Sequence, residues 1–97
     1  MGSLLDNCCC EVTTSDAGDD QVIADDFTTL DANVPAIGCG RWSVAGGSGV
    51  FKNKKKYNTL VTGLSAGINV FTWTISLDCR NCPCAETSTD TVTITVL

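Results

Sequence analysis

The chain contains no histidine, and its 97 residues include only six lysines and arginines against eleven aspartates and glutamates. Histidine is the side chain that most often acts as a general base, and serine or threonine nucleophiles normally need such a base. The net charge of −5 also lacks the basic face that generic nucleic-acid binding requires. We therefore expect neither catalysis, nor a cofactor, nor a nucleic-acid partner.

Long apolar segments are missing as well. No run approaches the roughly 20 residues that a membrane-spanning helix needs, so we expect no membrane insertion. The opening MGSLL lacks the basic stretch and apolar core of a secretory signal. We interpret residues 1–7 as a linker or cloned start and residues 8–97 as a single domain, with any export signal outside this sequence.

Helical periodicity is also absent, whereas apolar and polar residues alternate strongly at a period of two. In residues 70–77 (VFTWTISL), the large apolar side chains fall on one face. In residues 90–97 (DTVTITVL), the branched aliphatic residues fall on one face and the threonines on the other, as in a half-solvated strand. The predicted inner residues are Phe71, Trp73, Ile75, Leu77, Val92, Ile94 and Val96.

Several shorter segments continue the strand pattern. RWSV is predicted to be a short strand with Trp42 and Val44 on its inner side, and the glycine-rich AGGSG and GLSAGIN supply turns. Short strands with a turn signal every 8 to 12 residues are typical of a β-sandwich. We therefore predict an all-β fold, an antiparallel β-sandwich of about seven strands. The other predicted strands are residues 9–14 with 21–24 (an interrupted first strand), 27–32, 49–52 and 57–63.

Three stretches carry a family resemblance: DAGDDQVIADDFTTLDANVPAIGCGRWSVAGGSGVF, TLVTGLSAGINVFTWTIS and DTVTITV. They resemble a repeat domain of secreted and surface proteins in the Bacteroidetes, which is similar to PKD and immunoglobulin-like modules and usually occurs in tandem. The resemblance spans roughly residues 16–97 and implies an immunoglobulin/PKD-like sandwich with an extracellular or cell-surface location. The residues that carry it are Ala17, Gly18, Asp20, Gln21, Leu30, Ala32, Asn33, Pro35, Gly38, Gly40, Trp42, Gly49, Leu64, Gly67, Asn69, Phe71 and Trp73, with the final threonine-rich strand. Such repeats often carry a cysteine where this chain has Ala24, whereas Cys39 stands where threonine or serine is commoner.

Seven cysteines occur in three segments of the chain. If successive strands reverse direction, these segments and the lysine-rich loop share one end of the sandwich. We favour disulfides between segments, because adjacent cysteines bridge each other only with strained geometry and because this cysteine content fits an oxidising compartment. The disulfide candidates are Cys8, Cys9, Cys10, Cys39, Cys79, Cys82 and Cys84.

Two other interpretations of the cysteines stay open. Cys79, Cys82 and Cys84 could hold zinc or an iron–sulfur cluster, since C-x-x-C lets two thiolates face one ion. There is no second C-x-x-C and no histidine to complete such a site. A thiol–disulfide oxidoreductase usually carries its C-x-x-C at the start of a helix, and no helix is predicted here.

The aspartates of DAGDDQ also have two interpretations. Asp16, Asp19 and Asp20 could supply oxygen ligands to calcium, although their spacing does not match an EF-hand loop. Aspartate is equally favoured in turns, where its side chain bonds to nearby backbone. We favour turn and surface aspartates.

The tryptophans and the lysine run are similarly ambiguous. Trp42 and Trp73 could form a sugar-stacking platform, but both lie on the predicted inner faces and we favour the core. The lysines of KNKKK, residues 52–56, are most simply a solvated hairpin loop. The alternative for this loop is a contact with an anionic polymer or lipid.

The function that these observations favour is a non-catalytic structural or adhesion module, a spacer repeat of a larger secreted or cell-surface protein. An odd number of alternating strands puts the two chain ends at opposite poles, so modules can follow one another in line. The expected partners are then neighbouring domains of the same parent protein. The alternatives are an accessory module that binds polysaccharide, calcium or another surface protein, and a cysteine-based metal site.

Overall fold

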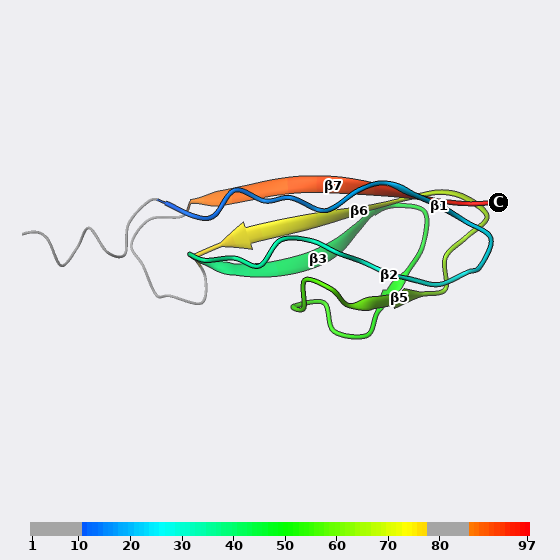
Figure 1. The fold of residues 1–97 in the computed structure, drawn as a ribbon, viewed down its shortest axis with the longest axis horizontal. Helices are drawn as coiled ribbons and strands as arrows, with labels where there is room; N and C mark the ends of the chain where they lie inside the picture. Colours follow the sequence, from blue (N-terminus) through cyan, green and yellow to red (C-terminus); the bar gives the residue numbers. More distant parts are fainter. Residues whose placement is uncertain (1–10, 78–85) are drawn as a thin grey trace, which may run out of the picture.

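The structure is a computed structural model that describes residues 11–77 and 86–97. Two β-sheets enclose the core, and neither described range contains a helix (Figure 1). The four-stranded sheet has the order β1-β7-β6-β3 and the three-stranded sheet the order β2-β5-β4. The strands are β1 (Gln21–Ile23), β2 (Thr28–Thr29), β3 (Cys39–Gly46), β4 (Val50–Phe51), β5 (Leu60–Thr62), β6 (Gly67–Ser76) and β7 (Thr87–Val96). The predicted all-β sandwich is confirmed, and no described segment forms a helix of the length and hydropathy needed to cross a bilayer.

The longest ladder joins β6 and β7, which pair antiparallel from Gly67 opposite Val96 to Ser76 opposite Thr87. Side chains along most of β6 and the second half of β7 alternate between buried and more exposed positions, as the two-residue period predicts. The predicted inner faces are therefore confirmed. All of their members are buried: Phe71, Trp73, Ile75, Leu77, Val92, Ile94 and Val96.

The first strand is shorter than the sequence predicts. Residues 11–20 are irregular, residues 9 and 10 lie outside the described residues, and backbone pairing begins only at β1. Side-chain hydrogen bonds nevertheless hold residues 15–20 beside β7, with the same sequence offset of 73 that relates Gln21 to its partner Ile94. These bonds are Ser15 N–H to Ser88 Oγ (2.9 Å), Ser15 Oγ–H to Ser88 O (2.6 Å), Ala17 N–H to Asp90 Oδ2 (2.8 Å) and Thr93 N–H to Asp20 Oδ1 (2.9 Å). Gly18, at a φ of 90°, bends the segment where a backbone ladder would otherwise continue.

One strand pair is parallel, in a sandwich that the sequence predicts to be antiparallel. β1 pairs parallel to β7, with Gln21 opposite Ile94 and Ile23 opposite Val96. The first and seventh of seven alternating strands point the same way, so these two can be neighbours only as a parallel pair. The exception therefore follows from the odd number of strands.

The inner position predicted for Val44 is wrong. Trp42 is 1% exposed, whereas Val44, two residues further along β3, is 44% exposed. The register between β3 and β6 shifts between Val44 and Gly46, and such an irregularity bends a strand and changes its twist. The end of β3 therefore does not hold its inner face against the core.

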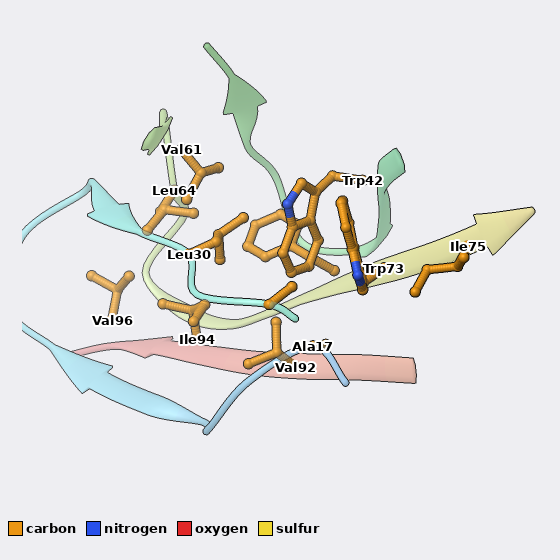
Figure 2. Close-up of a cluster of buried hydrophobic side chains, with 12 residues drawn as sticks. Ala17, Leu30, Trp42, Val61, Leu64, Trp73, Ile75, Val92, Ile94 and Val96 are labelled. Carbon is orange, nitrogen blue, oxygen red and sulfur yellow. The ribbon is translucent and has the colours of Figure 1, made fainter. Parts of the chain in front are cut away.

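The core is built around two tryptophans that face each other across β3 and β6 (Figure 2). The ring centroids of Trp42 and Trp73 lie 5.0 Å apart, and both side chains are essentially fully buried. Phe51 from the second sheet stacks on Trp42 and meets Phe71 edge-on, at centroid distances of 6.2 and 5.4 Å. The core interpretation of both tryptophans is therefore confirmed.

Asn69 is a fully buried polar residue at the opposite end of β6 from Ser76. Its Oδ1 accepts hydrogen bonds from the Ser48 and Ser65 backbone N–H groups and from the Ser65 hydroxyl. Its Nδ2 donates to the carbonyl oxygens of Ser65 and Gly67 at 2.9 and 3.3 Å, and to Ile94 O at 3.3 Å. One amide thus ties the turn before β4, the turn before β6 and strand β7 together, so its burial leaves neither polar atom unbonded.

Gly40→Ala tests how tightly the tryptophan pair is packed. A Cβ at Gly40 would lie 2.1 Å from Cζ2 of Trp73, so a large rigid ring would have to move. We expect the free energy of unfolding, measured by urea denaturation, to fall by about 1–3 kcal/mol. Gly46→Ala is the matched control on the same strand, because its nearest atom is 3.8 Å away. Equal stabilities for the two variants would contradict this packing argument.

Candidate functional site

The described flanks of the cysteine-bearing segments meet at one end of the sandwich. β3 begins at Cys39, which lies opposite Ser76 at the end of β6, and Ser76 lies opposite Thr87 at the start of β7. The N-terminal segment reaches the same end, because Thr13 N–H donates to Ile37 O at 3.1 Å. The flanks therefore lie at one end, whereas residues 52–56 bond to Trp42, three residues further along β3. The convergence of the cysteines themselves stays a prediction.

Cys39 is disulfide-bonded in the structure. The remaining cysteines lie outside the described residues, so the pairing stays a prediction, as does the alternative zinc or iron–sulfur site. Those cysteines are Cys8, Cys9, Cys10, Cys79, Cys82 and Cys84.

The aspartates of DAGDDQ are exposed, and two of them bond to backbone N–H groups. Asp16 Oδ1 accepts from Gly18 N–H at 2.9 Å, and Asp20 Oδ1 accepts from Thr93 N–H at the same distance. Within residues 11–77 and 86–97, no three Asp, Glu, Cys or His side chains gather in a way that could hold a metal ion. The calcium alternative, which includes Asp19, therefore rests on the sequence alone.

The lysine run lies in the hairpin between β4 and β5, as the sequence predicts, and its four lysines are exposed. We call residues 52–59 the lysine loop. Its backbone is held from within, since Asn53 accepts from Lys55 N–H at its Oδ1 (3.1 Å) and from Lys56 N–H at its carbonyl (3.0 Å). Asn53 N–H in turn donates to Thr59 Oγ1 at 2.9 Å. The loop is therefore a folded turn.

The lysine loop is also held from the core. Trp42 donates twice to it, from its backbone N–H to Lys54 O at 2.7 Å and from its indole N–H to Lys56 O at 3.1 Å. On the other side, Ala32 N–H donates to Tyr57 O at 3.0 Å. These bonds hold three carbonyl groups of the loop against the sandwich, so the backbone of the loop has a fixed position.

A hollow of about 460 Å³ opens between this loop and the second sheet. Two residues of the second sheet line the bottom of the hollow. Because Val61 is buried in the core, the adjacent Leu60 points to the outer face of the sheet, and so does Thr29, which pairs with Leu60. The Oδ1 atom of Asn58, another lining residue, is buried and has no hydrogen-bond partner in the described structure. The lining residues are Thr29, Lys52, Asn53, Lys56, Asn58, Thr59 and Leu60.

Sequence reasoning places the lysines but misses the hollow. The signal that could have pointed to it is Leu60, an apolar residue directly beside the inward Val61 and therefore on an outer face. Leu60 is half-buried in the structure and lines the hollow. The two asparagines that flank the last three lysines carry no pattern specific to a site.

The chain matches no family model and no curated protein. It is similar in structure to a PKD domain from KIAA 1837 protein, with 28% sequence identity, a TM-score of 0.61 and coverage of 90% of each chain. It is also similar to a PKD domain of human KIAA0319, with 24% identity, a TM-score of 0.57 and coverage of 84% of this chain and 80% of that one. The fold is PKD-like. The predicted immunoglobulin/PKD-like sandwich is thus confirmed. The descriptions of the two PKD domains name no ligand, so they do not indicate what this PKD-like module binds.

Trp42→Phe tests whether the indole N–H holds the lysine loop. The variant keeps an aromatic ring but loses the bond to Lys56 O, so we expect faster amide hydrogen exchange at Lys55 and Lys56. The stability should fall by about 1–2 kcal/mol, the sum of one hydrogen bond and some lost packing. Exchange measured by NMR or mass spectrometry checks the first expectation.

Trp73→Phe is the matched control for that variant. It removes the same atoms from the core. The indole N–H of Trp73, however, donates to Asn33 Oδ1 at 3.1 Å, away from the lysine loop. Its effect should appear at Asp16, whose N–H shares that Asn33 oxygen. If both variants loosen the lysine loop equally, lost packing rather than the Trp42 bond is responsible.

Proposed function

We propose that this PKD-like module is a non-catalytic structural or adhesion unit, a spacer repeat within a larger secreted or cell-surface protein. The resemblance to Bacteroidetes surface-protein repeats supports this assignment, and its expected partners are the neighbouring domains of that protein. The observation that carries the proposal is the position of the two ends of the described chain. They lie at opposite poles of the sandwich (Figure 1).

Contacts at each pole support this placement. Thr13 bonds to Ile37, next to the end where β3 begins. At the other pole, Val96 pairs with Gly67, the first residue of β6, and Leu97 N–H donates to Ile23 O at 2.8 Å. A chain that enters at one pole and leaves at the other adds the full length of the sandwich to whatever it joins.

The use of buried polar groups supports the non-catalytic part of the proposal. The described buried polar residues are Ser15, Thr59 and Asn69, and each makes hydrogen bonds that hold strands or turns together. A catalytic site needs polar groups that are held ready for a substrate instead. The chain also has no histidine, the side chain that most often serves as the base in nucleophilic catalysis.

The cysteines support an exported location. Disulfides persist in oxidising compartments, and Cys39 is already in the bonded state. Cys39 lies at the end of the sandwich where the flanks of the other cysteine segments meet. One disulfide framework at this pole would account both for the bonded state of Cys39 and for the position of these flanks.

Tandem proteins of one, two and three copies test the spacer role by small-angle X-ray scattering. Strands β6 and β7 have 10 residues each, so each added copy should lengthen the particle by roughly 30–35 Å. Copies that fold back on each other would leave the maximum dimension nearly unchanged and would contradict the spacer role.

Cys39→Ser tests the disulfide framework. We expect it to lower the free energy of unfolding by about 2–4 kcal/mol, because the unfolded chain is no longer cross-linked there. The mass of the denatured wild-type protein should be lower by two hydrogens per bridge and should return to the reduced value after treatment with reductant. Alkylation of all seven thiols without reductant would rule the framework out.

A further inference from the structure

We propose that the end of the sandwich where the chain leaves packs directly against the opposite end of a following module of the same kind, through an apolar contact. This inference rests on the proposed spacer role and adds to it the residues that form the junction. The spacer role does not require such a contact, because modules joined by a free connection would also follow one another in line. A packed junction makes the row of modules stiff.

Exposed apolar side chains gather at the end where the chain leaves (Figure 1). Single exposed hydrophobic residues are normal on a protein surface, whereas a cluster of them marks a contact surface. Of the eight large hydrophobic residues that are exposed in the described chain, four lie at this end. We call these four the exit patch: Val22 on β1, Phe27 in the turn between β1 and β2, Ile68 on β6 and Leu97 after β7.

The pairing register of the four-stranded sheet brings three members of the exit patch together. Thr95 pairs with Val22 on one side and with Ile68 on the other, so the three residues form one row across the sheet. Because Val96 is buried in the core, this row faces outward, and Leu97 follows on the same outer face. Val22 and Ile68 are 67% and 65% exposed, so the sandwich itself covers neither of them.

Phe27 adds an aromatic side chain to the exit patch. Its turn is held beside the start of β6, because Leu64 N–H donates to Asp26 O at 2.9 Å. Phe27 is nevertheless exposed, and aromatic residues are enriched where proteins meet. The exposed residues Asp25 and Asp26 precede it in the turn and give the patch the polar border that is typical of protein contacts.

The opposite end of the module carries the second part of the contact. We call Val34 and Ile37, both exposed, the entry patch. Ile37 O accepts from Thr13 N–H at 3.1 Å, and Asn33, next to Val34, donates from its Nδ2 to Thr14 O at 2.8 Å. Both residues therefore lie beside the start of the described chain. In a row of modules, the exit patch of one module faces the entry patch of the next.

The position of Leu97 favours a following module over an unattached partner. Leu97 belongs to the exit patch, and its N–H donates to Ile23 O at 2.8 Å, so a module joined after Leu97 begins at the patch itself. Such a module is held at an effective concentration on the order of millimolar, and a small apolar contact is then enough to keep the two ends together. A free protein lacks this advantage and needs a larger interface.

Two other occupants of the exit patch fit less well. Pairing of two exit patches would bring the Asp25 and Asp26 carboxylates of both molecules together, and like charges repel across an interface. An anionic lipid surface would be repelled by the same carboxylates and by the net charge of −5.

The test is an NMR comparison of a tandem of two complete copies, in which only the first copy carries 15N, with a single labelled copy. The single copy carries residues 1–10 after Leu97 as a tail, so it contains the connecting sequence without a second module. We expect the amides of Val22, Phe27 and Ile68 to differ in chemical shift between the two proteins, and the lysine loop to be unchanged. Identical spectra would overturn the contact. The same shifts in the tailed single copy at high concentration would overturn the assignment to a following module.

Small-angle X-ray scattering of the same tandem separates this test from that of the spacer role. If the tandem is lengthened as expected but the spectra are identical, the modules are spacers on a free connection, and only the contact is overturned. If the tandem is not lengthened, the spacer role and the contact both fail.

Variants of the exit patch locate the contact. Val22→Thr with Ile68→Thr keeps β-branched residues that fit a strand and removes apolar surface, so in the first copy it should abolish at least half of the shift difference at Phe27. The same pair in the second copy is the matched control, because no module follows that exit patch, and the difference at Phe27 should remain. Equal losses from both positions would overturn the contact. Unchanged amides in the lysine loop show that the labelled copy stays folded.

Variants of the entry patch identify the other partner. Val34→Thr with Ile37→Thr in the second copy should reduce the shift difference at Phe27 of the first copy by the same amount. The same substitutions in the first copy are the control and should have no effect on it. If the exit variants act but the entry variants in the second copy do not, the entry patch is not the partner and the proposed junction is wrong.

Discussion

The rest of the structure depends on the contact between Trp42 and Trp73. The two rings pack at 5.0 Å between β3 and β6, and they fill the centre of the core with almost no exposure. Burying an indole leaves its N–H in need of a partner, and each tryptophan meets that need by bonding outward to a different connection. Trp42 holds the lysine loop and Trp73 holds the segment around Asn33. The same pair that supplies apolar burial therefore also fixes the two longest connections of the described chain.

The topology is a direct consequence of strand number. Seven strands that alternate in direction must begin and end with strands of the same sense, and in this sandwich those two strands lie side by side. Parallel pairing, opposite poles for the chain ends and a common end for the cysteine flanks are three results of that one count. None of them needs a special sequence feature.

The strands can be predicted from the sequence because apolar core residues alternate with polar residues along them. Phe71, Trp73 and Ile94 lie two residues apart from other buried residues, and local period alone assigns their side. Val44 fails because its exposure depends on a register shift between strands, which has no local signature. The hollow could not be predicted because it is closed by bonds such as that from Trp42 to Lys56, whose partners are 14 residues apart. An unpartnered atom such as Asn58 Oδ1 is likewise a property of packing.

The offset of 73 residues that relates Ser15 to Ser88 and Ile23 to Val96 has a mechanical consequence. Tension applied between the two poles would slide the first segment along β7, so its hydrogen bonds would be loaded in shear and would share the force. Peeling them one at a time would require pulling both segments from the same end, which the positions of the chain ends prevent. Resistance to force is set by the rate of unfolding rather than by equilibrium stability. The side-chain bonds of Ser15, Asp90 and Asp20 lengthen that shared contact beyond the three backbone pairs of β1.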